Sequence, residues 1–479
     1  MQTSNYSTII VDLGSGFIKA GFGGEDGPRS IFNSLVGIPK MPGLMVGMEQ
    51  KEQYVGDEAI SKLEIMNFIS PIQRGEVTDW DKFDTLLHYL FYNEMKIVPE
   101  EISILITESP LSSKENRQKL TEVLFETFNV EKIHIANSSM LGLYSYGKTS
   151  GLVVDSGFNV TSTVPVYEGY PLTHASLKMN VGGEDLSKNL LDMIKDNIDP
   201  NYKLLKGRIL ADDIKEKLAY ILLNKDDAGN DNEEYTYSLP DGKTINLSNE
   251  LFKCCDCLFN PECPVVNEAE NVINNNENAA EANENNNEEE DKKEEEEDKK
   301  EEEEEKKVEE EEKKVEEEKK VEEEKKEEEK NERPPTSHSN KSAHSNKSHH
   351  SNKSQHSNKS HHSNKSNHSY KRLKILSVKD MVLESINKCD SDIINDIKES
   401  ICLIGGNTLL KNFGERLKNE LSESLGGNFK MNNSNERQFS AWIGGSIVAS
   451  LDNFQYMWVS KQEFDENGKN LLAVDSKCF

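Results

Sequence analysis

Ile9-Ile10-Val11-Asp12-Leu13-Gly14-Ser15-Gly16-Phe17-Ile18-Lys19-Ala20-Gly21-Phe22 is the stretch that decides the fold of this 479-residue chain. An apolar run ends at Gly14-Ser15-Gly16 and a second, alternating run follows, which predicts a β-hairpin with a tight turn. Glycines let the backbone approach a phosphate closely, and the exposed amides and the Ser15 hydroxyl can donate hydrogen bonds to its oxygens. Lys19 can neutralise phosphate charge, and Asp12 can hold a hydrated Mg²⁺ through water.

A second stretch repeats this pattern. Gly151-Leu152-Val153-Val154-Asp155-Ser156-Gly157 again places Asp, Ser and Gly after an apolar run, and Asp155 follows Asp12 by 143 positions. A single Gly-Ser-Gly turn after a strand is more often only a turn. Two matching hairpins, however, predict a duplicated fold that holds a nucleotide from both sides.

Length and charge narrow the class of protein. A chain of 479 residues exceeds one typical hydrophobic core, so two lobes are expected. The formal net charge of −30 argues against binding to a phosphate backbone, and we expect no direct nucleic-acid partner. The N-terminus lacks a basic region followed by an apolar core, and no apolar run reaches about 18 residues, so no membrane association is expected.

Further motifs carry a resemblance to a known family. The chain resembles actin in six strings, namely Tyr54-Val55-Gly56-Asp57-Glu58-Ala59, Phe125-Glu126-Thr127-Phe128-Asn129, Val166-Tyr167-Glu168-Gly169, Ile214-Lys215-Glu216-Lys217-Leu218, Trp442-Ile443-Gly444-Gly445-Ser446-Ile447 and Lys477-Cys478-Phe479. The resemblance covers residues 8–262 and about 375–479. One segment after Gly406, residues 409–417, is more similar to centractin, an actin-related protein.

The resemblance implies an α/β fold, the duplicated superfold that actins share with heat-shock chaperones and sugar kinases, with two lobes around a nucleotide cleft. The implied boundaries are residues 1–33, 71–145 and 440–479 for subdomain 1, 34–70 for subdomain 2 with a mobile loop, 146–181 and 375–439 for subdomain 3, 182–262 for subdomain 4, and 263–374 for an insert.

The insert has a composition of its own. A block of Glu and Lys precedes repeats of His-Ser-Asn-Lys-Ser that begin at residues 338, 344, 350, 356 and 362. Low apolar content predicts disorder for this tract. Its histidines could capture a metal or respond to pH, although repeat expansion in a tolerated loop is the simpler interpretation. In actin this position faces the filament axis, so the insert would either crowd ordinary two-strand packing or be extruded from it.

The resemblance also implies ATP or ADP as the ligand, with Mg²⁺ held through water by Asp12 and Asp155. The residues it places around the nucleotide are Asp12, Gly14, Ser15, Gly16 and Lys19 in the first hairpin, Ser156 and Gly157 in the second, and Gly183, Lys215, Glu216, Gly405, Gly406 and Asn407 elsewhere.

Hydrolysis is expected to be weak or absent. The family positions the attacking water with a Gln, a His and an Asp, and the corresponding residues here are Ser138, Ser162 and Asp155. A serine is too short to hold a water that a glutamine reaches, and it cannot accept a proton near neutral pH as histidine can. Phe158 replaces an acidic family residue, and Arg74 replaces a histidine.

The resemblance implies a role in assembly. In the actin family a mobile loop contacts the next subunit, and Met41, Leu44, Met45 and Val46 supply its apolar residues here. We therefore expect a structural subunit of the cytoskeleton in the cytoplasm, in contact with other actin-like subunits or actin-binding proteins. The alternatives are a dynamic filament that hydrolyses ATP and a nuclear actin-related subunit of a chromatin-remodelling complex.

Overall fold

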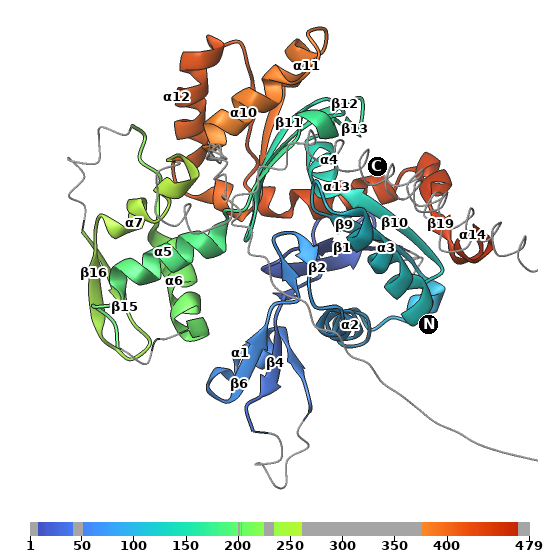
Figure 1. Ribbon diagram of the computed structural model, residues 1–479, viewed down its shortest axis with the longest axis horizontal. Coiled ribbons are helices and arrows are strands. Elements are labelled where there is room, and N and C mark those ends of the chain that lie inside the picture. The colour runs from blue at the N-terminus through green and yellow to red at the C-terminus, as the bar shows by residue number, and fades with distance from the viewer. Residues whose placement is uncertain are drawn as a thin grey trace, which may run out of the picture. The chain divides into compact units, whose positions relative to one another are not determined.

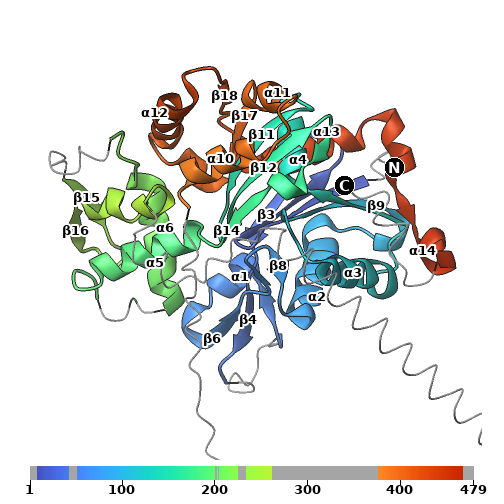
Figure 2. The same cartoon turned by 45° about the horizontal axis from the view of Figure 1, so that its top comes forward.

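Two mixed β-sheets form the framework of the protein in a computed structural model, shown from two directions in Figures 1 and 2. The structure describes residues 8–41, 51–199, 202, 204–224, 234–260 and 376–467. The predicted insert at 263–374 lies outside these residues, as do Leu44, Met45 and Val46 of the predicted contact loop.

The first sheet has the strand order β19-β10-β9-β1-β2-β3. β1 pairs with β2 antiparallel, with Asp12 opposite Lys19, and with β9 parallel. The predicted first hairpin is therefore confirmed. The strands are β1 (Thr8–Leu13), β2 (Phe17–Phe22), β3 (Ser30–Asn33), β9 (Ser103–Glu108), β10 (Lys132–Asn137) and β19 (Val459–Ser460).

The second sheet repeats this arrangement. Its order is β13-β12-β11-β17-β18, with β14 also on β12. Here β11 pairs with β12 antiparallel and with β17 parallel, so β11 corresponds to β1 and the predicted duplication is confirmed. The strands are β11 (Gly151–Ser156), β12 (Thr161–Tyr167), β13 (Tyr170–Pro171), β14 (Leu177–Met179), β17 (Ile401–Ile404) and β18 (Met431–Asn432).

Both faces of each sheet are covered by other parts of the chain. Successive residues of a strand point to opposite faces, so neighbouring residues join different cores. In β1, Ile9 and Val11 join the core beneath the helices α2 (Trp80–His88) and α3 (Lys114–Glu122). Ile10 joins the core formed with α4 (Ser138–Tyr144) and α13 (Ser440–Ala449). In β11, Val154 belongs to the large core of the second half, and Val153 packs with Leu143 of α4. Continuous burial therefore explains the unbroken apolar runs in the sequence.

Two helices on the first sheet begin at side chains that cap them. α2 (Trp80–His88) has Asp79 as its N-cap, and its carboxylate accepts a 3.0 Å hydrogen bond from the Lys82 amide. α3 (Lys114–Glu122) has Ser113 as its N-cap. Both helices continue as π-helical turns, Tyr89–Met95 and Val123–Thr127, whose buried side chains extend the core.

α4 (Ser138–Tyr144) and α13 (Ser440–Ala449) pack together and connect the two halves. They cross so closely that a Cβ on Gly444 would lie 1.8 Å from the carbonyl oxygen of Leu141. Glycine is therefore required at the crossing, because any side chain would push the helices apart.

The remaining elements extend these two halves. On the first side are β4 (Val36–Pro39), β5 (Tyr54–Val55), α1 (Gly56–Ile60), β6 (Met66–Ile69), β7 (Ile72–Gln73), β8 (Glu76–Val77) and α14 (Lys461–Asn467). On the second are α5 (Gly183–Ile194), α6 (Leu204–Leu218), β15 (Tyr235–Ser238), β16 (Thr244–Leu247), α7 (Glu250–Lys253), α10 (Val378–Asn387), α11 (Ile394–Lys398) and α12 (Phe413–Leu425). Among the described helices, none combines the length and apolar character needed to cross a bilayer.

Candidate functional site

A cavity of about 800 Å³ lies where the two hairpins face each other. This volume falls in the range of small-molecule sites. Of the residues predicted from the sequence, it is lined by Asp12, Gly14, Ser15, Gly16, Lys19, Ser138, Asp155, Gly157, Ser162, Gly183, Lys215, Glu216, Gly405, Gly406 and Asn407. Segments far apart in the chain therefore meet at one site.

The first turn is held by Ser34, which follows β3. The Ser34 amide donates to the carbonyl oxygen of Gly16 (2.9 Å), and the Ser34 hydroxyl donates to that of Gly14 (2.6 Å). A Cβ on Gly14 would lie 2.5 Å from the carbonyl oxygen of Phe17, so this position requires glycine. Because Ser34 occupies the two carbonyls, the turn is held in one conformation.

Asp12 is fixed by two neighbours. Its Oδ2 accepts a hydrogen bond from the Lys19 ammonium at 2.8 Å, and its Oδ1 accepts one from the Thr107 hydroxyl at 2.9 Å. Thr107 also lines the cavity and was not predicted from the sequence. It lies near the end of β9, beside the end of β1, and the carboxyl ends of adjacent parallel strands are a usual place for ligand contacts.

Asp155 lines the cavity from the second hairpin, opposite Ser162 in the β11–β12 register. Burial and, to a smaller extent, the nearby Asp12 carboxylate raise the pKa of Asp155 to about 7, although Lys19 opposes the shift. Two carboxylates that face one cavity and repel each other favour the binding of a positive charge between them. Oxygen donors of this kind fit a hydrated Mg²⁺, so Asp12 and Asp155 could hold one through water.

Ser156 does not line the cavity. Its side chain is fully buried, its hydroxyl lies 2.9 Å from the Thr161 hydroxyl, and it accepts a hydrogen bond from the Asn407 amide at 3.1 Å. Asn407 also donates to the carbonyl oxygen of Gly157 at 2.7 Å. Asn407 thus ties the second hairpin to the turn after β17, and Ser156 supports the hairpin from behind.

Gly405 permits this close approach. It has φ +87°, and a Cβ there would lie 2.4 Å from the carbonyl oxygen of Ser156. A Cβ on Gly406 would meet nothing within 4 Å, so that glycine leaves the cavity open beside it. The glycine pair therefore combines a steric requirement with access for a ligand.

Lys215 lines the cavity, but its ammonium group points toward α5. It donates to the Gly183 carbonyl (2.8 Å), the Ser187 hydroxyl (2.7 Å) and the Asp212 carboxylate (2.9 Å). These bonds use all three donors of an ammonium group. Lys215 therefore fixes the start of α5. The neighbouring Glu216 also lines the cavity, and burial raises the pKa of Glu216.

The two positions predicted to be impaired for hydrolysis both face the cavity. Ser138 begins α4 directly after β10, and Ser162 lies on β12 and is buried. Phe158, at the tip of the second hairpin, also lines the cavity. The cavity wall further includes Tyr220, Tyr235, Lys411 and Arg437, which the sequence did not single out because they lie on elements that meet only in the folded chain.

Met41 is the one described residue of the predicted contact set. It follows β4, is not among the residues that line the cavity, and has 64% of its surface exposed. An exposed methionine at this position is compatible with a contact to another molecule.

Comparison with known proteins completes the description. The family described as Actin matches residues 3–479 of this chain. Putative actin-29 of Dictyostelium discoideum is 30% identical to it over 489 residues, covering 99% of this chain and 98% of that protein.

Proposed function

This chain belongs to the actin family, and from that premise we propose that it binds ATP or ADP with Mg²⁺ in the cavity between the hairpins. We further propose that it acts as a structural or assembly subunit and hydrolyses ATP weakly or not at all. The observation that carries the proposal is the pair of glycine turns lining one cavity with Asp12 and Asp155.

The chemistry of the cavity supports a bound phosphate chain. Backbone amides of the two turns and the Ser15 hydroxyl are donors for phosphate oxygens. Lys19 brings positive charge to the same wall, and the carboxylates suit a hydrated cation. A bound Mg²⁺ would supply charge neutralisation for the phosphates. Glu216 could accept hydrogen bonds from the nucleoside, whereas the Lys215 ammonium is already committed to protein acceptors.

The side chains around the cavity support weak hydrolysis. Ser138 and Ser162 stand at the two positions where the family uses Gln and His, and neither can hold and deprotonate an attacking water in the same way. Loss of a general base alone costs about 10²- to 10⁴-fold in rate. A nucleotide that is bound but not hydrolysed stabilises the folded state by mass action and so acts as a structural ligand.

The proposed role in assembly is supported by the exposed Met41 at the start of the predicted contact loop. We place this role in the cytoplasmic cytoskeleton, with other actin-like subunits or actin-binding proteins as partners. A dynamic, ATP-hydrolysing filament is the alternative that the experiment below separates most directly.

The test measures ATP affinity by displacement of a fluorescent analogue and phosphate release from the same sample with Mg²⁺. We expect tight binding with almost no release. The variant Ser138→Gln with Ser162→His should then raise phosphate release by about 10²-fold or more, since it restores both groups. Ser424→Gln, on the exposed face of α12, is the matched control and should change neither quantity.

Two outcomes would contradict the proposal. Failure of the wild-type protein to bind ATP or ADP would remove the nucleotide function altogether. Rapid phosphate release by the wild-type protein, with no gain in the double variant, would show that other groups position the water and would favour the dynamic filament. Sedimentation under polymerising salt, with and without ATP, tests assembly separately.

A further inference from the structure

Arg74 lies in a strained turn between two short strands. β7 and β8 pair with Gln73 opposite Glu76, so Arg74 and Gly75 are the central residues of a two-residue hairpin. Both have positive φ, +50° for Arg74 and +84° for Gly75, as a type I′ turn requires. Glycine adopts this conformation freely, but arginine is disfavoured there. A residue in a strained backbone conformation needs other contacts that compensate for the strain.

The hairpin belongs to the first half of the molecule. Ile72 and Val77 are buried in the same core cluster as β1 and β9. The Glu76 carboxylate accepts a hydrogen bond from the Ser113 amide at 2.8 Å, and the Asn116 side chain accepts one from the Val77 amide at 3.0 Å. The base of the turn is therefore fixed to the first sheet and to the start of α3.

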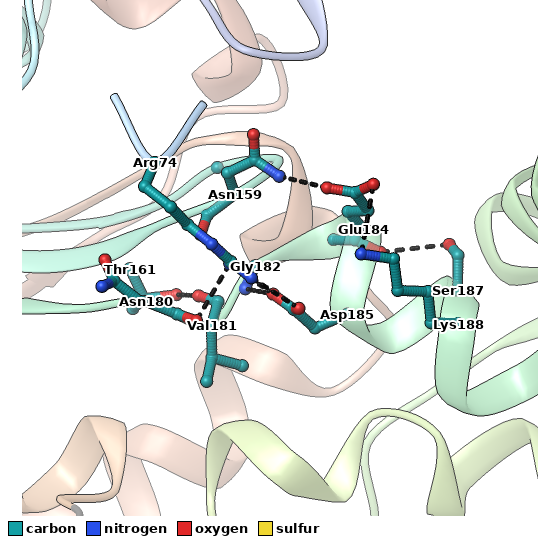
Figure 3. A network of polar contacts seen from close by, with 12 residues as sticks. Arg74, Asn159, Thr161, Asn180, Val181, Gly182, Glu184, Asp185, Ser187 and Lys188 are labelled. Carbon is teal, nitrogen blue, oxygen red and sulfur yellow. Dashed lines mark hydrogen bonds and ion pairs between the residues drawn. The ribbon is translucent and has the colours of Figure 1, made fainter. Parts of the chain in front are cut away.

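The Arg74 side chain, however, reaches the second half (Figure 3). Its guanidinium contacts both carboxylate oxygens of Asp185, at 2.8 and 2.9 Å, and Nη1 also donates to the carbonyl oxygens of Asn159 (2.6 Å) and Asn180 (2.9 Å). Asp185 is only 3% exposed and accepts a further bond from the Gly182 amide. The next residue, Leu186, belongs to the core of the second half.

A second contact joins the two halves at the tips of the β1–β2 and β11–β12 hairpins. Phe158 packs against Gly16 so closely that a Cβ on Gly16 would lie 2.7 Å from the Phe158 ring. The Arg208 guanidinium lies 5.5 Å from the centroid of the same Phe158 ring. The tips of the two hairpins therefore touch directly through an apolar side chain.

We propose that Arg74 and Asp185 form a clamp that keeps the two halves closed around the cavity whether or not a ligand is bound. Every bond in the clamp joins protein to protein, so none requires a nucleotide. Opening the cavity would separate the β7–β8 turn from α5. The buried Asp185 carboxylate would then lose the cation that balances its charge, which is unfavourable. We also infer that the clamp slows nucleotide release. This second part of the inference rests on the proposed nucleotide function.

The first experiment uses nucleotide-free full-length protein and therefore does not depend on that function. Hydrogen exchange is measured for residues 157–160 and 180–186, which contain Gly182, Glu184 and Asp185 amides bonded within this region. Arg74→Ala should accelerate exchange there by about 10- to 100-fold, typical for the loss of a charge-assisted interaction. β9 in the first sheet is the internal reference and should be unchanged.

Two conservative variants and a control complete the design. Asp185→Asn keeps the side-chain size and should act like Arg74→Ala, whereas Arg74→Lys keeps the charge but loses the two-pronged geometry and should be intermediate. The double variant should be no faster than either single one, since both remove the same pair. Lys188→Ala removes a cation from α5 whose ion pair with Glu184 stays within the second half, and it should have no effect.

The second experiment measures dissociation of a fluorescent ATP analogue from the same variants, where we expect the same order and a similar acceleration. Unchanged amide exchange in Arg74→Ala and Asp185→Asn would refute the clamp, as would equal acceleration in β9, which indicates global unfolding. Faster exchange with no binding of the analogue by the wild-type protein would uphold the clamp and refute the proposed function. Faster exchange with wild-type nucleotide release would refute the effect on release.

Discussion

His134 provides the sharpest test of the packing, because the structure sets the size of its effect. It lies on β10 with only 2% of its surface exposed. Its Nδ1 lies 3.1 Å from the carbonyl oxygen of Met457, and the Phe454 and Trp458 rings pack edge-on against it. A carbonyl can only accept, so Nδ1 carries the proton of the neutral ring. Burial lowers the pKa of His134 to about 4.

The sign of the pH dependence follows from this shift. The pKa of His134 falls from its ordinary value of 6.5 to about 4 on folding, so the unfolded chain binds the proton more strongly. The contribution of the neutral His134 to the free energy of unfolding is complete above pH 6.5 and is lost as the pH falls toward 4. Each pKa unit corresponds to about 1.4 kcal/mol, so the free energy of unfolding should fall by about 3 kcal/mol over this range.

Urea unfolding at about pH 7.5 and pH 4.5 measures this difference. His134→Gln is the comparison, because its amide can still donate to the Met457 carbonyl but does not titrate. The carboxylates and the other histidines titrate in both proteins and cancel in the comparison. We expect the wild-type protein to lose about 3 kcal/mol more than the variant. Equal losses in both proteins would show that His134 is not held neutral by burial.

Three further predictions concern stability and are measured by urea unfolding. Gly444→Ala should cost about 3 kcal/mol, because its Cβ would overlap the Leu141 carbonyl, whereas Gly27→Ala, with nothing within 4 Å, is the control and should be nearly neutral. Asp79→Ala should cost about 1 kcal/mol by removing the N-cap of α2. Lys215→Ala should cost about 3 kcal/mol, since it removes a buried ammonium group that pairs with Asp212 and also donates to Gly183 and Ser187, and a loss below 1 kcal/mol would contradict this structural role.

Local patterns explain why much of the fold was predictable. An unbroken apolar run followed by a glycine turn identified β1 and β11. Such signals depend on residues a few positions apart, because strand alternation, turns and caps are short-range effects. The family resemblance then joined them into one duplicated fold, which the strand pairing of both sheets confirms.

The candidate site was predictable in its residues but not in their orientations. The sequence assigned Ser156 and Lys215 to nucleotide contact, yet the folded chain turns the Ser156 hydroxyl toward Thr161 and Asn407 and the Lys215 ammonium toward α5. Whether a side chain faces a ligand or a neighbouring helix depends on how distant segments pack. Sequence position does not fix that direction.

The sequence by itself thus determined the two hairpins and the set of residues that could hold a phosphate chain. Only the tertiary structure decided that Arg74 pairs with Asp185, 111 positions away, and that Asp155 is held near a neutral pKa. The physical reason is the distance along the chain over which each effect acts. Turns and caps follow from neighbouring residues, whereas burial and ion pairing depend on which surfaces exclude water after the two halves close on each other.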